Sequence, residues 1–190
     1  MYIRKILVGI LIIGILVGCY IMYNITQTIF KPITAFNNEV AYIYLDSDAN
    51  FTDVRNEIEP LVNDIISFET LAKKIGYIER VKGGKYTIRK GMNSNDIIQT
   101  LLANSTWVAV VIPPNKTTEE LSKIISDQIE AEEDDVYPIL KDSTTFKELN
   151  IEKSTLGAIL EPSTYLMPWN TSAEDFRSRI VSITKKRSEN

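Results

Sequence analysis

Hydrophobic residues are concentrated near the start of this 190-residue chain. Residues Ile6–Met22 form an uncharged apolar run, ILVGILIIGILVGCYIM. Its length lies at the lower edge of what a bilayer-spanning helix needs, and Tyr23 and Ile25 could extend it. A buried core helix is the alternative, but such a helix is seldom apolar on every face. The run therefore predicts a transmembrane helix.

After a polar and aromatic connector, the pattern alternates between β-rich runs and amphipathic helices. Val40–Leu45 is typical of a strand, and Asn50 is a plausible N-cap because apolar residues recur at helical spacing after it. The elements predicted up to residue 105 are, in order, a strand, two helices, a turn, a strand and a helix: Val40–Leu45, a helix opened by Asn50, Ile65–Ile75, Lys82–Gly84, Lys85–Arg89, and a helix that begins at Met92-Asn93-Ser94.

Two stretches of this part form a weak internal repeat. IYLDSDANFTDVRNEI and YTIRKGMNSNDIIQTL share a strand, a polar turn, an Asn cap and an Asp-aliphatic pair inside a helix. Such strand–turn–helix units with an aliphatic face are typical of LysM-type modules. A generic α+β fold without that relationship is the alternative.

The second half predicts a strand, a helix and a further helix near the end. Trp107–Ile112 is a continuous apolar run stopped by Pro113, and Thr117 with Glu120 forms a capping box. The helix after this box is expected to carry Leu121, Ile124, Ile125 and Ile129 on one face. Thr171 and Glu174 predict a second capping box, followed by a helix that carries Phe176, Ile180 and Ile183 and ends in Lys185-Lys186-Arg187.

Composition excludes several classes of chemistry. The chain has no histidine and one cysteine, so Cys/His zinc sites, Ser-His-Asp triads and Cys-His dyads are not available. The net charge of −4 argues against nucleic acid as a partner, because phosphate binding needs a basic face. The acidic run 130–135 lacks the alternating ligands and central glycine of a calcium loop, which favours a solvated helix end. We expect no metal and no cofactor.

Charges beside the apolar run predict its orientation. Arg4 and Lys5 precede it and the next positive residue is Lys31, so the positive-inside rule places the N-terminus in the cytoplasm. The chain is then expected to be a single-pass membrane protein, anchored by residues 6–22, with its bulk outside the cytoplasm. Leu16-Val17-Gly18-Cys19 also fits a lipobox, which leaves a lipoprotein anchored at Cys19 as an alternative.

The segment Leu160–Phe176, LEPSTYLMPWNTSAEDF, carries a family resemblance. Pro162-Ser163-Thr164-Tyr165 and Trp169-Asn170-Thr171-Ser172-Ala173-Glu174 resemble a signature of the MltG (YceG-like) family of membrane-anchored endolytic murein transglycosylases. The Trp-Asn-Thr-Ser version looks most like the branch found in Bacteroidetes-type bacteria. Ile29-Phe30-Lys31-Pro32 resembles the juxtamembrane segment of that branch, and Gly84–Ile98 is similar to the LysM-like subdomain of the family.

The resemblance implies a location in the bacterial inner membrane, with the bulk of the chain in the periplasm, and an α+β fold in four parts. These are a signal anchor (1–25), a juxtamembrane connector (26–38), a LysM-like α/β subdomain (39–106) and the truncated start of a YceG-like catalytic domain (107–190). The family cleaves murein with one glutamate, which lies in a later helix with a pattern similar to Ala-Ser-Ile-Val-Glu-Lys-Glu. No such pattern occurs here; the nearest segment, Asn56–Pro60, has a proline after its second glutamate. We therefore expect a chain without its catalytic half.

The remaining candidates are residues for glycan or partner contact, because sugar faces stack on aromatic rings. Glu161 is included because it departs from the family pattern just before Pro162. Core packing is the alternative for every aromatic ring, and above all for Trp107 in its apolar strand. The predicted contact residues are Tyr86, Glu161, Thr164, Tyr165 and Trp169.

Three functions stay open at this point. The first is a non-catalytic protein that binds peptidoglycan or scaffolds a cell-envelope complex. The second is the N-terminal portion of an active transglycosylase whose catalytic half lies elsewhere, and the third is a tethered adaptor with no role in glycan binding. We also expect a second protein to cover the 160–183 region, because a truncated domain would expose Leu160 and Phe176.

Overall fold

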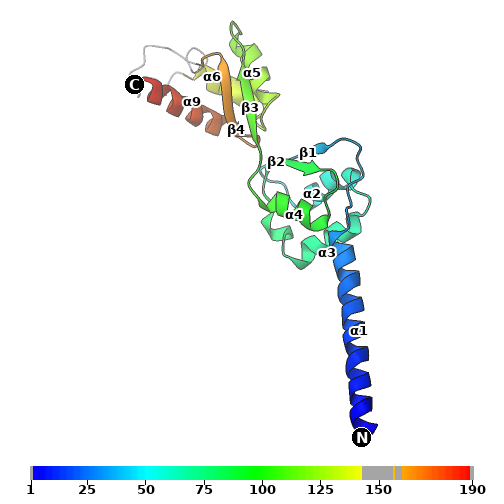
Figure 1. The fold of residues 1–190 in the computed structure, drawn as a ribbon. Coiled ribbons are helices and arrows are strands. Elements are labelled where there is room, and N and C mark those ends of the chain that lie inside the picture. Colours follow the sequence, from blue (N-terminus) through cyan, green and yellow to red (C-terminus); the bar gives the residue numbers. More distant parts are fainter. Residues whose placement is uncertain (1, 143–155, 157–159, 189–190) are drawn as a thin grey trace. The chain divides into compact units, whose positions relative to one another are not determined.

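The computed structural model describes residues 2–142, 156 and 160–188 (Figure 1). The chain forms two compact units. Unit 1 combines Met1–Ala41, Asn50–Val81 and Thr87–Ala103, and unit 2 combines Tyr42–Ala49, Lys82–Tyr86 and Asn104–Asn190. The chain passes between the units inside strands β1 (Val40–Leu45) and β2 (Gly84–Arg89), which pair as a two-stranded sheet.

The apolar run lies in one continuous helix, α1 (Tyr2–Phe30) (Figure 1). Its segment Ile6–Tyr23 is long and apolar enough to cross a membrane, and none of that segment is buried inside the protein. This is consistent with a membrane helix and not with a core helix, whose apolar side chains would be covered. The helix continues to Phe30, so the predicted connector at 26–38 starts as part of the same helix.

Unit 1 packs three further α-helices, α2 (Phe51–Ile58), α3 (Ile65–Lys74) and α4 (Ser94–Leu102), with the short 3₁₀ helices η1 (Glu59–Leu61) and η2 (Ile78–Arg80). The fully buried side chains of α2, α3 and α4 include Val54, Ile58, Phe68, Ala72, Ile97, Ile98 and Leu101. These positions recur at helical spacing in the sequence, which is why the pattern located the helices correctly.

Both predicted asparagine caps are confirmed. The side chains of Asn50 and Asn93 each accept a backbone N–H at the start of their helix. The carboxylate of an aspartate three residues later, Asp53 or Asp96, accepts the backbone N–H of the cap residue. Such reciprocal bonds satisfy N–H groups that a helix start leaves without partners. The repeat noted in the sequence is therefore a repeat of local structure. A LysM-like identity for this part stays a prediction.

The predicted turn at Lys82–Gly84 is wrong, because Gly84 is already the first residue of β2. Gly83 and Gly84 allow other segments of the chain to pack closely against this stretch. A Cβ on Gly83 would lie 2.6 Å from the carbonyl oxygen of Asp46, and one on Gly84, whose φ is +136°, would lie 2.4 Å from Cβ of Ser105. Only glycine permits both the approach and the backbone conformation.

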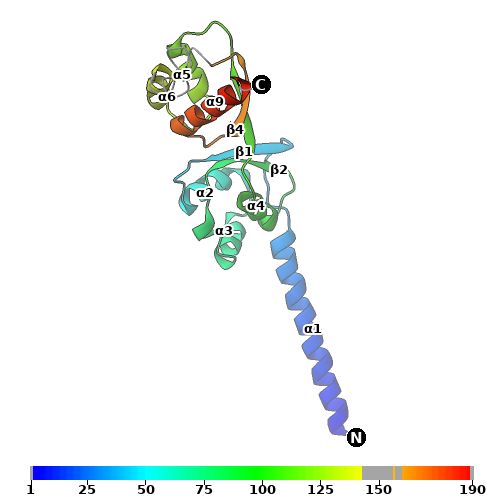
Figure 2. The same ribbon diagram turned by 90° about the vertical axis from the view of Figure 1, so that its left-hand side faces the viewer.

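Unit 2 is built on an antiparallel ribbon of β3 (Trp107–Ile112) and β4 (Ser163–Pro168). The register pairs Trp107 with Pro168, Val110 with Tyr165 and Ile112 with Ser163. Helices α5 (Thr118–Ser126), α6 (Glu133–Lys141) and α9 (Ala173–Ser188) pack with the ribbon (Figure 2). Their shared core includes Val110, Ile112, Leu121, Ile125, Val136, Leu140, Leu160, Tyr165, Met167, Phe176 and Ile180.

Three local predictions for unit 2 need correction. Helix α5 ends at Ser126, so Ile129 is buried but lies beyond the helix. The acidic run lies at a solvated helix end as predicted, but this end is the start of α6 and not the end of the helix before it. Glu133, Asp134 and Asp135 form the exposed first turn of α6, where negative charge interacts favourably with the helix dipole. Leu160 and Phe176 are 7% and 0% exposed, so they do not form the open apolar surface expected of them.

The cap of α9 is Ser172, one residue later than predicted. The hydroxyl of Ser172 accepts the Asp175 N–H at 3.1 Å and donates to the Asp175 carboxylate at 2.7 Å. Thr171 instead turns inward and donates to the Pro168 carbonyl at 2.6 Å. The Thr171 hydroxyl is therefore bonded to the last residue of β4, and Ser172 caps the helix in its place.

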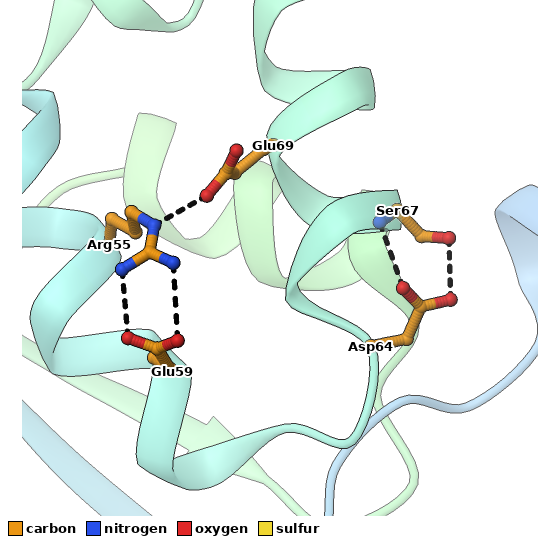
Figure 3. A network of polar contacts seen from close by, with 5 residues as sticks. All are labelled: Arg55, Glu59, Asp64, Ser67 and Glu69. Carbon is orange, nitrogen blue, oxygen red and sulfur yellow. Dashed lines mark hydrogen bonds and ion pairs between the residues drawn. The ribbon is translucent and has the colours of Figure 1, made fainter.

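Polar contacts join α2, η1 and α3 of unit 1 (Figure 3). Arg55 on α2 binds Glu59 at 2.8 Å and reaches Glu69 on α3 at 2.5 Å. Asp64 caps α3 by accepting the Ser67 N–H at 3.0 Å and the Ser67 hydroxyl at 2.6 Å. The Ser67 hydroxyl, and next its backbone N–H, lower the pKa of Asp64 because both bonds favour the charged carboxylate.

We expect Ser67→Ala to raise the pKa of Asp64, since it removes the hydroxyl that contributes most to lowering it. The folded pKa lies below the unfolded one, so this cap stabilises the protein at neutral pH and the contribution is lost as pH falls through the folded pKa. An NMR titration of the Asp64 carboxyl carbon measures the change. Ser126→Ala, on α5 of unit 2, is the control, and an unchanged Asp64 titration in Ser67→Ala would contradict the assignment.

Phe176→Ala is expected to lower the free energy of unfolding of unit 2 by about 3–5 kcal/mol, because it leaves a cavity in the core. Both tryptophans, Trp107 and Trp169, belong to unit 2, so tryptophan fluorescence during urea unfolding of the full chain in detergent reports on this unit alone. Leu166→Ala, at a side chain 57% exposed, should change the value by no more than about 0.5 kcal/mol. Equal effects would show that Phe176 is not in the core.

Candidate functional site

The register of the ribbon brings two tryptophans to one end of it. Trp107 is the first residue of β3 and pairs with Pro168, the last residue of β4, so Trp169 follows immediately at the same end. Trp107 is 52% exposed, and the guanidinium carbon of Arg179 lies 4.9 Å from its ring centroid. Trp169 is half-buried.

Strand β1 adds tyrosines to this end of unit 2. Ile43 and Leu45 are buried while Tyr42 and Tyr44 are exposed, the alternation expected of a strand with one covered face. The rings of Tyr44 and Trp169 meet edge to face, with centroids 5.1 Å apart and planes at 62°. This geometry is favourable for an aromatic pair and leaves ring surface open.

Lys85 on β2 lies against the same tyrosines. Its ammonium is 4.3 Å from the ring centroid of Tyr42 and 5.5 Å from that of Tyr44. Both distances fall within the range of cation–π attraction. The backbone of Lys85 is fixed as well, because its carbonyl accepts the Thr106 N–H at 2.8 Å.

Together these side chains line a groove of about 530 Å³ within unit 2. We call it the aromatic groove. Its lining combines three aromatic rings, one cation, one carboxylate and one amide: Tyr44, Trp107, Trp169, Lys85, Asp127 and Gln128.

Gln128 closes the edge of β3 beside the groove. Its Oε1 accepts the Val111 N–H at 2.8 Å, and its Nε2 donates to the Val111 carbonyl at 3.2 Å and to the Ile124 carbonyl at 2.6 Å. The amide thus takes the place of a neighbouring strand and satisfies backbone groups that an edge leaves unpaired.

Glu130 holds the loop after β1 against the turn that carries Trp169. Its two carboxylate oxygens accept the N–H and the hydroxyl of Ser47, each at 2.6 Å, and its own N–H donates to the Trp169 carbonyl at 2.8 Å. Asn170 also donates to the Ser47 hydroxyl, at 3.4 Å. We call Ser47, Glu130 and Asn170 the polar clamp.

The comparisons with known proteins identify the family. The YceG-like family matches residues 43–190. This chain belongs to the YceG-like family. The match begins inside β1 and extends through α9, so it includes every residue of the aromatic groove and of the polar clamp.

The chain is also similar to a protein of known structure. That structure is the crystal structure of a YceG-like protein from Listeria monocytogenes, with 20% sequence identity and a TM-score of 0.37. The similarity covers 80% of this chain and 56% of that protein, so the chain spans little more than half of its length. Among curated proteins, none matches this YceG-like chain significantly.

Two of the residues predicted to contact glycan are buried in the YceG-like chain. Tyr86 is 2% exposed and its hydroxyl donates to the Lys82 carbonyl at 2.9 Å; burial raises the pKa of this phenol. Tyr165 is 5% exposed and its hydroxyl donates to the Glu161 carbonyl at 3.0 Å. Both rings pack inward and present no free face to a sugar.

Two other predicted residues are exposed but lie away from the groove. Thr164 is on the outer face of β4, paired with Val111, and Glu161 lies before β4 begins. The length of the strand therefore separates Glu161 from Trp169, which is the one predicted contact residue in the groove. Trp107, for which core packing was favoured, is exposed there instead.

Sequence reasoning missed the groove residues of β1, β2 and the end of α5. The two tyrosines of VAYIYL gave a usable signal, because they alternate with Ile43 and Leu45 and so belong to one face. No comparable signal existed for Lys85 or Asp127, since only tertiary contacts bring them to the tryptophans.

The groove of this YceG-like chain is equipped for binding. Its rings can stack, its cation and carboxylate can pair with polar groups, and the Asp127 side chain is exposed. Within the described part of the chain, no cluster of three or more His, Cys, Asp or Glu residues could hold a metal ion.

We expect Glu130→Ala to loosen Trp169, because the substitution removes both acceptors for Ser47. The test uses Trp107→Phe as background, so that Trp169 is the one fluorophore, and measures acrylamide quenching, which should increase. Glu132→Ala is the matched control, since Glu132 makes no side-chain bond at the start of α6. Unchanged quenching in Glu130→Ala would show that the polar clamp does not order Trp169.

Proposed function

We propose that these 190 residues hold a glycan strand of peptidoglycan beside the membrane and do not cleave it. Membership of the YceG-like family supports a role in murein metabolism, since the resemblance in the sequence is to murein transglycosylases. The single observation that carries the proposal is the aromatic groove, where Tyr44, Trp107 and Trp169 present ring surface around a cation and a carboxylate.

Aromatic rings suit a glycan because each pyranose ring has an apolar face of C–H groups that can lie on a ring, while its hydroxyls need polar partners. Trp107 and Trp169 supply the apolar platforms, and Asp127 and Lys85 supply an acceptor and a donor at the border. An aliphatic groove would bind such a ligand without orienting it.

The membrane part of the proposal rests on α1. In this proposal its segment Ile6–Tyr23 spans the bacterial inner membrane, and Arg4 with Lys5 keeps the N-terminus in the cytoplasm, which places both units in the periplasm. Lipidation at Cys19 is the alternative anchor, and it would leave both units in the same compartment.

The absence of cleavage rests on the residues of this chain. Its 190 residues contain no glutamate in the pattern that the resemblance leads one to expect, and Asn56–Pro60, the nearest segment, contributes Glu59 to the ion pair with Arg55 on the surface of unit 1. The carboxylate of Glu59 thus makes a structural contact, and Glu59 is not among the residues that line the aromatic groove.

A second candidate function is the substrate-holding portion of an active transglycosylase. The outer face of the β3–β4 ribbon favours it, because Trp107, Val111 and Leu166 are each at least half exposed on one side of two paired strands. An apolar sheet face of this kind is usually covered by another polypeptide. This face replaces Leu160 and Phe176 as the reason to expect a partner at residues 160–183.

The proposal is tested by sedimentation of the full chain, in nanodiscs, with purified peptidoglycan sacculi. We expect retention, and we expect Trp169→Ala and Trp107→Ala each to weaken it roughly two- to ten-fold, as for the loss of an aromatic contact of about 0.5–1.5 kcal/mol. Ile66→Ala, an exposed apolar residue of unit 1, is the control and should bind as the parent does.

Mass spectrometry of the same mixtures covers the second half of the proposal. No anhydro-muropeptides should appear in the supernatant, because no residue of the groove serves as a general acid. Release of such products by the chain alone would contradict a purely binding role, and lack of sedimentation would remove the glycan-binding role itself.

A further inference from the structure

We propose that Lys85 forms a carboxylate subsite at the tyrosine side of the aromatic groove, so that the groove selects glycan strands that bear a carboxylate over neutral ones. This inference rests on the proposed glycan-binding function and specifies its substrate. It concerns a charge on the sugar, whereas the stacking argument above concerns the apolar faces.

The position of the ammonium is the first reason. Lys85 has a flexible side chain of four methylenes, yet here its charged end lies over Tyr42 at 4.3 Å and close to Tyr44 at 5.5 Å. Two rings and a backbone anchored to Thr106 hold it at the groove. A cation fixed before binding loses little side-chain entropy when an anion arrives.

The charge balance is the second reason. None of the ion pairs found among the described residues includes Lys85, although the lysine is half-buried. Asp127 lines the same groove but is not within ion-pair distance of it. The tyrosine rings satisfy the ammonium only in part, since cation–π attraction is weaker than a charged hydrogen bond. An incoming carboxylate would accept hydrogen bonds from the Lys85 ammonium and balance its charge.

The adjacency of rings and cation is the third reason. Tyr44 touches both Lys85 and Trp169, so an anion at the ammonium and a sugar face on the tryptophan can belong to one ligand. Muramic acid carries a lactyl carboxyl next to its ring, which is free when the stem peptide is absent. A stem peptide brings carboxylates of its own. The shared chemistry is a carboxylate attached to an amino-sugar strand.

Three ligands separate the possibilities when their binding to the full chain in nanodiscs is measured by calorimetry. They are a neutral N-acetylglucosamine tetramer, a peptide-free tetrasaccharide with muramic acid, and the same tetrasaccharide with stem peptides. We expect the two carboxylate ligands to bind about ten-fold more tightly than the neutral one, with a preference that weakens as salt rises. The tighter of the two identifies the source of the carboxylate.

Substitution of the lysine gives the decisive comparison. Lys85→Gln should lower the affinity for the two carboxylate ligands about ten-fold more than the affinity for the neutral tetramer, because it removes the charge but keeps an N–H donor for sugar hydroxyls. Lys85→Arg should keep the preference for carboxylate ligands. Lys123→Gln, on the exposed side of α5, is the control.

Two results would overturn the inference. Equal affinity for neutral and carboxylate ligands in the parent, or an equal loss for all ligands in Lys85→Gln, would mean that the lysine only supports the tyrosines. Failure of all three ligands to bind would instead overturn the proposed glycan-binding function, and the subsite with it.

Discussion

The pairing of β3 with β4 is the constraint on which unit 2 depends. Because side chains alternate across a strand, the register that places Val110 beside Tyr165 turns both inward and turns Trp107 outward. A shift of one residue would expose the core face and bury the tryptophan. The same register sets Trp107 opposite Pro168, so one set of backbone hydrogen bonds specifies both the core and the end of the ribbon where the two tryptophans of the groove lie.

The groove itself depends on contacts between segments that are far apart in sequence. Ser47 and Glu130 are 83 positions apart, and Ser47 and Asn170 are 123 apart. Gly83 is part of the same arrangement, because any side chain there would collide with the loop that Glu130 holds. The polar clamp joins the loop after β1 to the turn that carries Trp169, so the site is a product of the tertiary fold and not of one motif.

This distinction explains what could be predicted from the sequence. Helix caps at Asn50, Asn93 and Thr117 and the strands at residues 40–45 and 107–112 follow from local rules, and they are confirmed. Errors occurred where tertiary contacts decide between equivalent residues. Thr171 and Ser172 are both good caps, but the Thr171 hydroxyl bonds to the Pro168 carbonyl and so does not cap the helix. Tyr86, Tyr165 and Trp107 are all aromatic, and only tertiary packing decides which of them are buried and which is exposed.

The Trp-Asn-Thr-Ser segment can now be assigned residue by residue. Trp169 contributes a ring to the groove, Asn170 donates to the polar clamp, Thr171 fastens the end of β4, and Ser172 opens α9. Every hydroxyl and amide of the segment thus has a structural partner, and the indole ring is its only group that faces the groove. The segment therefore ends a strand, reverses the chain and presents one aromatic ring to the groove.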